Sequence, residues 1–101
     1  MKMLLIVFRE NLEEEIHGLL QSHDVKAFTE LHKVAGTGAT GAAFHAFSWP
    51  GVNGMILTAL PEDEADRVVE GFKAFRDQRV QQQHGAKIPL RVFVLPCLQV
   101  V

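Results

Sequence analysis

The residues with the clearest potential to bind a ligand form a glycine-rich segment near the middle of the chain. Gly36-Thr37-Gly38-Ala39-Thr40-Gly41 matches the G-x-G-x-x-G pattern with which dinucleotide-binding proteins hold a pyrophosphate. That pattern works in a turn between a first strand and a helix, whereas residues 44–50, which follow it here, have no helical pattern. Two interpretations stay open: backbone N–H groups that turn toward an anion, or a mobile glycine-rich loop.

The five histidines could supply metal ligands, but they show no short ligand spacing such as H-x-x-x-H. They are His17, His23, His32, His45 and His84. The single cysteine has no C-x-x-C partner, so a metal site would have to be assembled by folding or across subunits. His45 is the best candidate ligand, because it lies in the irregular segment between two aromatic residues, and His32 or His84 of a neighbouring subunit could join it. The alternative is a solvated surface histidine.

The sequence contains no motif for catalysis. No serine, threonine or cysteine lies in a nucleophile motif, and no pair of carboxylates can be assigned to a common pocket. Acidic residues cluster instead at positions 13–15 and 62–64, where the first turn of a helix favours negative charge. We therefore predict that the protein is not an enzyme.

Four segments have the patterns of β-strands. Three are continuous apolar runs, which are typical of strands covered on both faces. They are Met3–Phe8, Met55–Leu60 and Leu90–Leu95. A fourth, from Val25 to about His32, alternates polar with apolar residues as a half-exposed strand does. Residues 36–54 hold five of the eight glycines and are predicted to form a loop.

Two helices are predicted between these strands. The first runs from Leu12, with Asn11 as its N-cap, to about Ser22, and the second runs from Pro61 to about Gln82. The order βαββαβ predicts an α+β, ferredoxin-like sandwich in which two helices cover one face of a four-stranded antiparallel sheet. The other face would then expose an apolar patch of several hundred Å², which a second copy of the chain would cover most simply.

Composition narrows the class of protein. The 101 residues carry a net charge of −2 and their basic residues are scattered, so nucleic acid is not an expected partner. The apolar fraction of 48% is enough for one domain over residues 1–101. One cysteine cannot form an intramolecular disulfide, and the N-terminal apolar run is too short for a signal peptide, so a cytoplasmic location is expected.

Several segments spread along the whole chain carry a family resemblance. They are Met1-Lys2-Met3, Val25–Thr29, Gly36-Thr37-Gly38, Leu60–Asp63, Asp66–Val69 and Arg91–Pro96. In these segments the chain resembles the P-II signal-transduction family and its P-II-like relatives, which are trimers of ferredoxin-like subunits. The fold is also similar to that of the divalent-cation-tolerance protein CutA.

The resemblance implies a ligand and the residues that bind it. In this family adenine nucleotides bind in clefts between subunits, and a long loop, the T-loop, contacts the transporter or enzyme that the ligand regulates. By position, the implied nucleotide site consists of Thr29, Gly36, Thr37, Gly38, Gly85 and Arg91. ATP, ADP or AMP should bind weakly, because one glycine remains in the phosphate loop and Met55 replaces an expected lysine. The lack of tyrosine indicates a divergent, P-II-like branch.

Two functional hypotheses follow. The first is a homotrimeric P-II-like regulatory protein that binds a small anionic ligand between its subunits and regulates a partner such as a membrane transporter. The alternative is a CutA-like or metal-efflux-associated protein that binds a divalent metal through His45.

Overall fold

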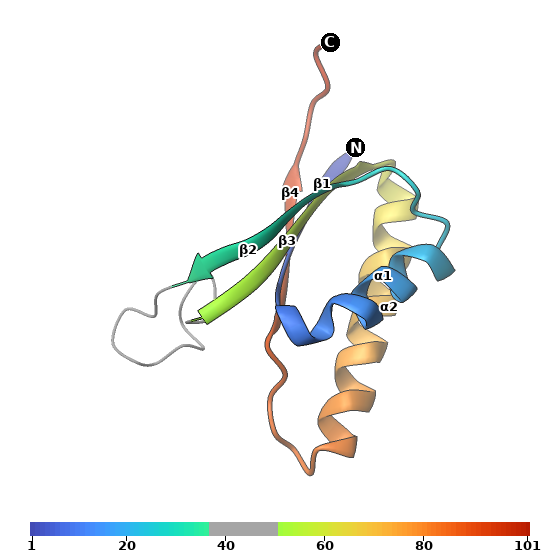
Figure 1. Ribbon diagram of the computed structural model, residues 1–101. Coiled ribbons are helices and arrows are strands. Elements are labelled where there is room, and N and C mark those ends of the chain that lie inside the picture. Colours follow the sequence, from blue (N-terminus) through green and yellow to red (C-terminus); the bar gives the residue numbers. More distant parts are fainter. Residues whose placement is uncertain (37–50) are drawn as a thin grey trace.

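Strand pairing defines the architecture of the chain, which is described by a computed structural model for residues 1–36 and 51–101. Within these residues, four strands form one antiparallel sheet in the order β2-β3-β1-β4 (Figure 1). The strands are β1 (Lys2–Arg9), β2 (Thr29–Gly36), β3 (Gly51–Leu60) and β4 (Leu90–Pro96). This arrangement confirms the predicted α+β, ferredoxin-like fold.

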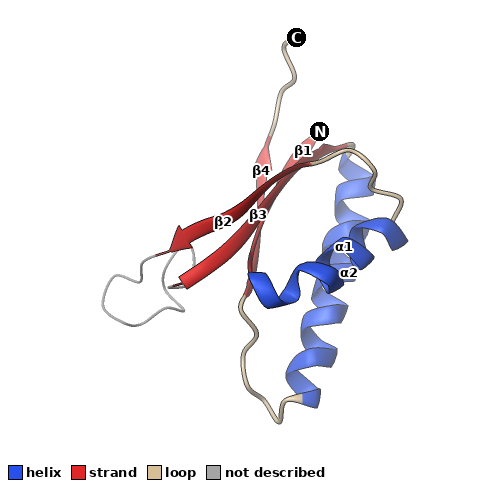
Figure 2. Cartoon of the chain, viewed as in Figure 1, coloured by secondary structure: helices blue, strands red, loops and turns tan. Residues whose placement is uncertain are grey.

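Two helices pack on the same face of the sheet (Figure 2). They are α1 (Glu13–Ser22), which follows a short 3-10 turn η1 (Glu10–Leu12), and α2 (Glu62–Gln82). The acidic residues 13–15 and 62–64 occupy their first turns, as predicted. No helix among the described residues is long and apolar enough to cross a membrane.

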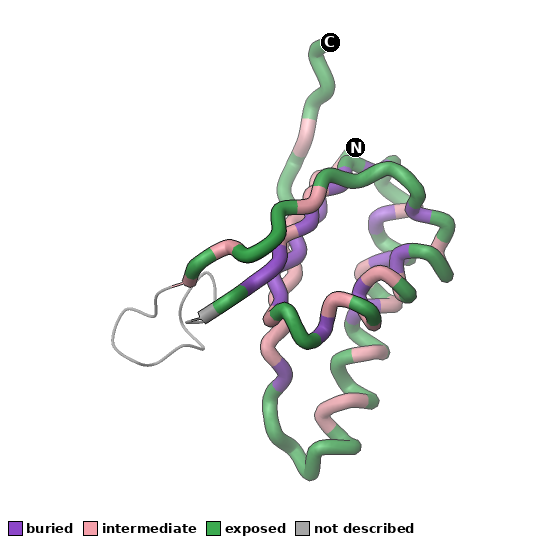
Figure 3. Tube along the Cα trace, in the orientation of Figure 1, coloured by how far each residue is buried: buried purple, intermediate pink, exposed green. Residues whose placement is uncertain are grey.

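The core lies between the helices and the central strands, where Figure 3 shows the buried positions. Successive strand side chains point to opposite faces, so alternate residues of β1 point toward the helices. Leu4, Ile6 and Phe8 are fully buried there. They pack with Ile56 of β3 and with Phe72 of α2.

The opposite face of the sheet has no helix on it. Leu5 of β1 lies on this face between Leu57 of β3 and Phe93 of β4, and all three are only partly buried. Leu31 and Leu95, on the two edge strands, are 46% and 44% exposed. The described part of one chain therefore leaves an apolar sheet face open, as the sequence predicts.

The sequence places β2 incorrectly. Residues 25–28 are not part of the strand, which begins at Thr29. In this segment the Ala27 carbonyl accepts a 2.9 Å hydrogen bond from the Thr58 hydroxyl. The strand continues to Gly36 through a β-bulge between Leu31 and Val34, where Lys33 has a positive φ of 55°.

Two further boundaries differ from the prediction. Asn11 is not an N-cap: it lies inside η1, Leu12 precedes the first residue of α1, and no side chain caps either turn. The predicted loop over 36–54 is shorter, because Gly36 belongs to β2 and β3 already begins at Gly51. The remainder of that loop, residues 37–50, lies outside the described residues.

Candidate ligand-binding site

Three basic side chains line one hollow beside β4. The hollow has a volume of about 520 Å³ and lies between β4, the second half of α2 and the connection that joins them. Arg76 contributes from α2, Lys87 from the connection and Arg91 from β4. Ile88 and Val92 add apolar surface beside them. Basic groups next to apolar surface suit a ligand that combines an anionic group with a planar, apolar part.

The connection between α2 and β4 is folded back onto the helix end. His84 and Gly85 both have positive φ, and the Gly85 N–H donates a 2.9 Å hydrogen bond to the Val80 carbonyl. This is a common way to end a helix, and it favours glycine because a side chain is strained at a φ of 89°. Further on, the Arg9 N–H donates to the Pro89 carbonyl at 3.0 Å. Both ends of the segment that carries Lys87 are therefore held in place.

Arg91 is positioned by strand pairing. It lies opposite Val7 of β1, on the face of the sheet that has no helix. Arg76, in contrast, comes from α2 and forms a 2.9 Å ion pair with Asp77, which neutralises part of its charge. The hollow therefore opens at the outer edge of β4, where side chains from both faces can reach it.

Two other residues of the predicted nucleotide site lie at the opposite edge of the sheet. Thr29 begins β2 and Gly36 ends it, paired with Gly51. Since β2 and β4 are separated by two strands, the edges are about 14 Å apart at strand spacings of about 4.8 Å. One chain therefore places Arg91 at the β4 edge and Thr29 and Gly36 at the β2 edge. Gly85 follows the end of α2 and does not line the hollow.

Three predicted residues lie outside the described residues. These are Thr37 and Gly38 of the implied nucleotide site and His45, the candidate metal ligand. Conversely, sequence reasoning did not include Arg76 or Lys87. The spacing of four residues between Arg76 and Val80 places both on one side of α2. This is the side that lines the hollow with the connection and β4, and it could have indicated Arg76.

Comparison with protein families identifies the chain. The family model for nitrogen regulatory protein P-II matches residues 1–101. The chain belongs to the P-II family. The family resemblance predicted from the sequence is thereby confirmed. A search of the curated proteins finds no match.

Solved P-II-like structures share this fold. CPII from Thiomonas intermedia K12, bound to ADP, AMP and acetate, is 26% identical over 93% of this chain and 82% of its own, with a TM-score of 0.62. The apo form of CPII, described as a nitrogen regulatory PII-like protein, is 25% identical over 92% of this chain and 84% of its own, with a TM-score of 0.64. A PII-like signaling protein from Thermus thermophilus, at 22% identity, a TM-score of 0.56 and coverages of 92% and 82%, shares the fold.

Proposed function

We propose that this P-II-family chain is a non-enzymatic regulatory protein that binds an adenine nucleotide, ADP or AMP, between the subunits of a homotrimer. The observation that carries the proposal is the hollow beside β4 that Arg76, Lys87 and Arg91 line. The similarity to CPII, whose structure is described as bound to ADP, AMP and acetate, supports the choice of ligand.

The division of the predicted site supports a ligand between subunits. Arg91 lies on the edge strand β4, while Thr29 and Gly36 lie on the opposite edge strand, β2. A head-to-tail contact between copies would place the β2 edge of one chain against the β4 edge of the next, and such contacts form a ring when the rotation between copies closes. Three copies would bury the open apolar face, including Leu31 and Leu95, at the centre of the ring.

The basic residues would hold the phosphates of the nucleotide. Guanidinium and ammonium groups form charge-assisted hydrogen bonds to phosphate oxygens, and Arg91 can form two at once. The apolar surface of Ile88 and Val92 offers a place for the base. Thr37 and Gly38, from the start of the implied T-loop, would complete the contact, and that loop would carry the signal to a partner such as a membrane transporter. Cytoplasmic location and one domain over residues 1–101 are part of the proposal.

A small anion is a second candidate ligand. CPII is also described as bound to ADP, AMP and bicarbonate, in a structure 26% identical over 93% of this chain and 88% of its own, with a TM-score of 0.59. Bicarbonate would then act together with the nucleotide. The comparisons offer no support for the CutA-like alternative.

Calorimetric titration of the full chain with ADP and AMP tests this proposal. Arg91→Ala should weaken ADP binding by about 10- to 100-fold, since a charge-assisted hydrogen bond contributes about 1.5–3 kcal/mol. Arg67→Ala is the matched control, because Arg67 is exposed in the first half of α2 and outside the hollow. Light scattering of both variants shows whether assembly is unchanged. Equal ADP affinity of the two variants, or no binding to the assembled wild type, would overturn the proposal.

A further inference from the structure

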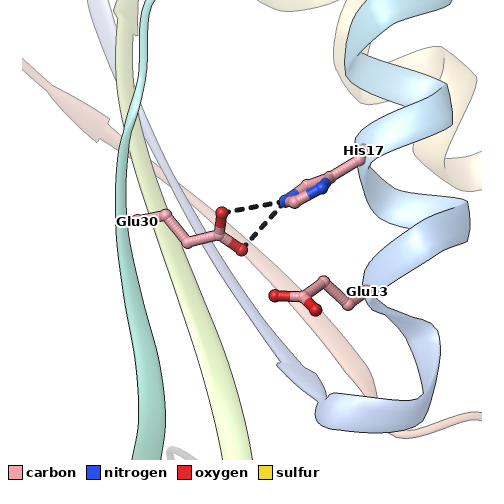
Figure 4. A group of neighbouring side chains, drawn as sticks. All are labelled: Glu13, His17 and Glu30. Atoms are coloured by element: carbon pink, nitrogen blue, oxygen red, sulfur yellow. Dashed lines mark hydrogen bonds and ion pairs between the residues drawn. The ribbon is translucent and has the colours of Figure 1, made fainter.

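Four side chains with metal-binding groups meet between α1 and β2, on the side of the sheet that the helices cover. Figure 4 shows three of them, Glu13, His17 and Glu30, and His32 is the fourth. Glu13 and His17 are four residues apart on α1 and so share one face of that helix. Glu30 and His32 are two residues apart on β2 and so share one face of that strand. Each element contributes one carboxylate and one imidazole.

The ligand atoms of these residues are already close together. His17 Nε2 lies 2.9 Å from both carboxylate oxygens of Glu30. His32 Nδ1 lies 3.0 Å from Glu13 Oε1, and His32 Nε2 lies 3.7 Å from Glu30 Oε1. The ligand atoms of Glu13, His17 and Glu30 all lie within 4.8 Å of one another. A tetrahedral ion with ligands at about 2.0–2.1 Å separates neighbouring ligand atoms by about 3.3 Å, so small side-chain rotations would suffice.

Surrounding contacts hold the inner part of the cluster in place and leave the outer part accessible. The Glu30 side chain is 12% exposed, whereas that of His32 is 62% exposed. The His17 ring packs against the Phe28 ring, with 5.9 Å between the centroids. The four residues also sit on a helix and a strand and not on loops, which is the support that a metal site needs. An ion could therefore enter from solvent on the side of His32.

We propose that Glu13, His17, Glu30 and His32 bind a divalent transition-metal ion that links α1 to β2. Two nitrogen and two oxygen donors without a thiolate suit Zn²⁺ or Co²⁺ better than Cu⁺. Two carboxylates with neutral imidazoles carry a charge of −2, which a divalent ion neutralises. This site goes beyond the proposed nucleotide function and does not depend on it.

The sequence contains a signal for this cluster that a search for paired histidines misses. The spacings are E-x-x-x-H at Glu13 and His17 and E-x-H at Glu30 and His32. Each fits the period of its own element, 3.6 residues for a helix and 2 for a strand. Neither spacing by itself indicates a metal, because the two halves meet only when β2 packs beside α1.

Titration of the full, metal-free chain with ZnCl₂ tests the site directly. The wild type should bind one Zn²⁺ per chain, and His17→Gln and His32→Gln should each weaken binding by at least about 100-fold, since even the loss of an outer-shell partner costs 10- to 100-fold. His84→Asn is the control, because His84 is exposed beyond α2 and asparagine tolerates its positive φ. It should change the affinity less than about 2-fold.

Thermal unfolding provides a second readout. Zn²⁺ at about 100 times the dissociation constant of the wild type should raise the Tm of the wild type by about 10–20 °C and that of His17→Gln by about 3 °C or less. Thermal unfolding of each variant without zinc shows whether the substitution itself destabilises the fold. We expect His32→Gln to fold normally, because the His32 side chain is exposed. Co²⁺ should give the intense visible absorption of a tetrahedral site.

Two results would overturn the proposal. One is the absence of zinc binding by the folded wild type, which would leave the cluster as three histidine–carboxylate ion pairs. The other is binding that survives in both His17→Gln and His32→Gln and is lost in His45→Gln, which would place the metal in the glycine-rich segment. Nucleotide titrations of the same variants keep the two proposals separate, because His17→Gln should bind ADP as the wild type does.

Discussion

Gly54 of β3 is covered by an aromatic ring, and filling its position should destabilise the protein. Gly54 pairs with Phe8 of β1, and a Cβ atom at Gly54 would lie 2.6 Å from Phe8 Cζ and 2.7 Å from Cε2. The Phe8 side chain is fully buried, so its ring cannot turn out to solvent. In Gly54→Ala the ring or the strand must therefore shift.

The size of the effect follows from two opposing contributions. Overfilling a packed core costs about 1–3 kcal/mol. Replacing a strand glycine by alanine recovers about 0.5–1 kcal/mol of backbone entropy. We expect a net loss of about 1–2 kcal/mol in the free energy of unfolding, which lowers the Tm of a domain of this size by about 5–10 °C.

Urea unfolding of a double-mutant cycle tests this reasoning. Phe8→Leu removes the ring edge, so Gly54→Ala should be neutral or stabilising in that background, with a coupling energy of about 1–2 kcal/mol. Gly18→Ala in α1 is the control: nothing lies within 4 Å of its added Cβ, and it should stabilise the helix by about 0.5–1 kcal/mol. Gly54→Ala with unchanged stability in both backgrounds would show that the ring does not fill this space.

Three further predictions concern assembly, ligand and pH. Light scattering should give three times the 11.3 kDa of one chain, whereas a stable monomer at micromolar concentration would contradict the proposed trimer. ATP should bind little more tightly than AMP, because Met55 replaces an expected lysine that would contact phosphate. Submicromolar ATP binding that is far tighter than AMP binding would show that the phosphate contacts are not weakened. The hydrogen bond from Lys2 to Asp66 raises the pKa of Lys2 above 10.5, with Glu62 adding to the effect. The ion pair of Lys2 therefore stabilises the fold fully at pH values below the ordinary lysine pKa, and this stabilisation is lost as the pH rises through the raised pKa. The difference in urea midpoint between wild type and Lys2→Met should shrink at high pH. A constant difference would argue against the ion pair.

Sequence patterns predict the parts of the fold in which local and tertiary preferences agree. Long apolar runs predict three strands, and an apolar stripe predicts one helix. The predicted segments all lie within, or within one residue of, the observed elements β1, β3, β4 and α2. β2 does not follow this rule: residues 25–28 alternate as a strand does but precede it, and the Ala27 carbonyl bonds the side chain of Thr58, 31 residues away. No local pattern contains that information.

The candidate sites show the same limit. Gly85 and Arg91 were implied by family resemblance, and Arg91 does line the hollow beside β4. Arg76 and Lys87 join it only because α2 packs alongside β4. Likewise, Glu13 and Glu30 become neighbours through the packing of a helix on a strand, 17 positions apart in the sequence.

The bulge in β2 changes which side chains of that strand are equivalent. In a regular strand Glu30, His32 and Val34 would share one face, but the extra residue between Leu31 and Val34 moves Val34 to the face of Leu31. An alignment of relatives that treats β2 as uninterrupted would therefore compare core-facing positions with outward-facing ones beyond residue 33. A relative with a regular strand at this point would share the first half of β2, yet its residues at the positions of Val34 and Ala35 would each point to the opposite face of the sheet.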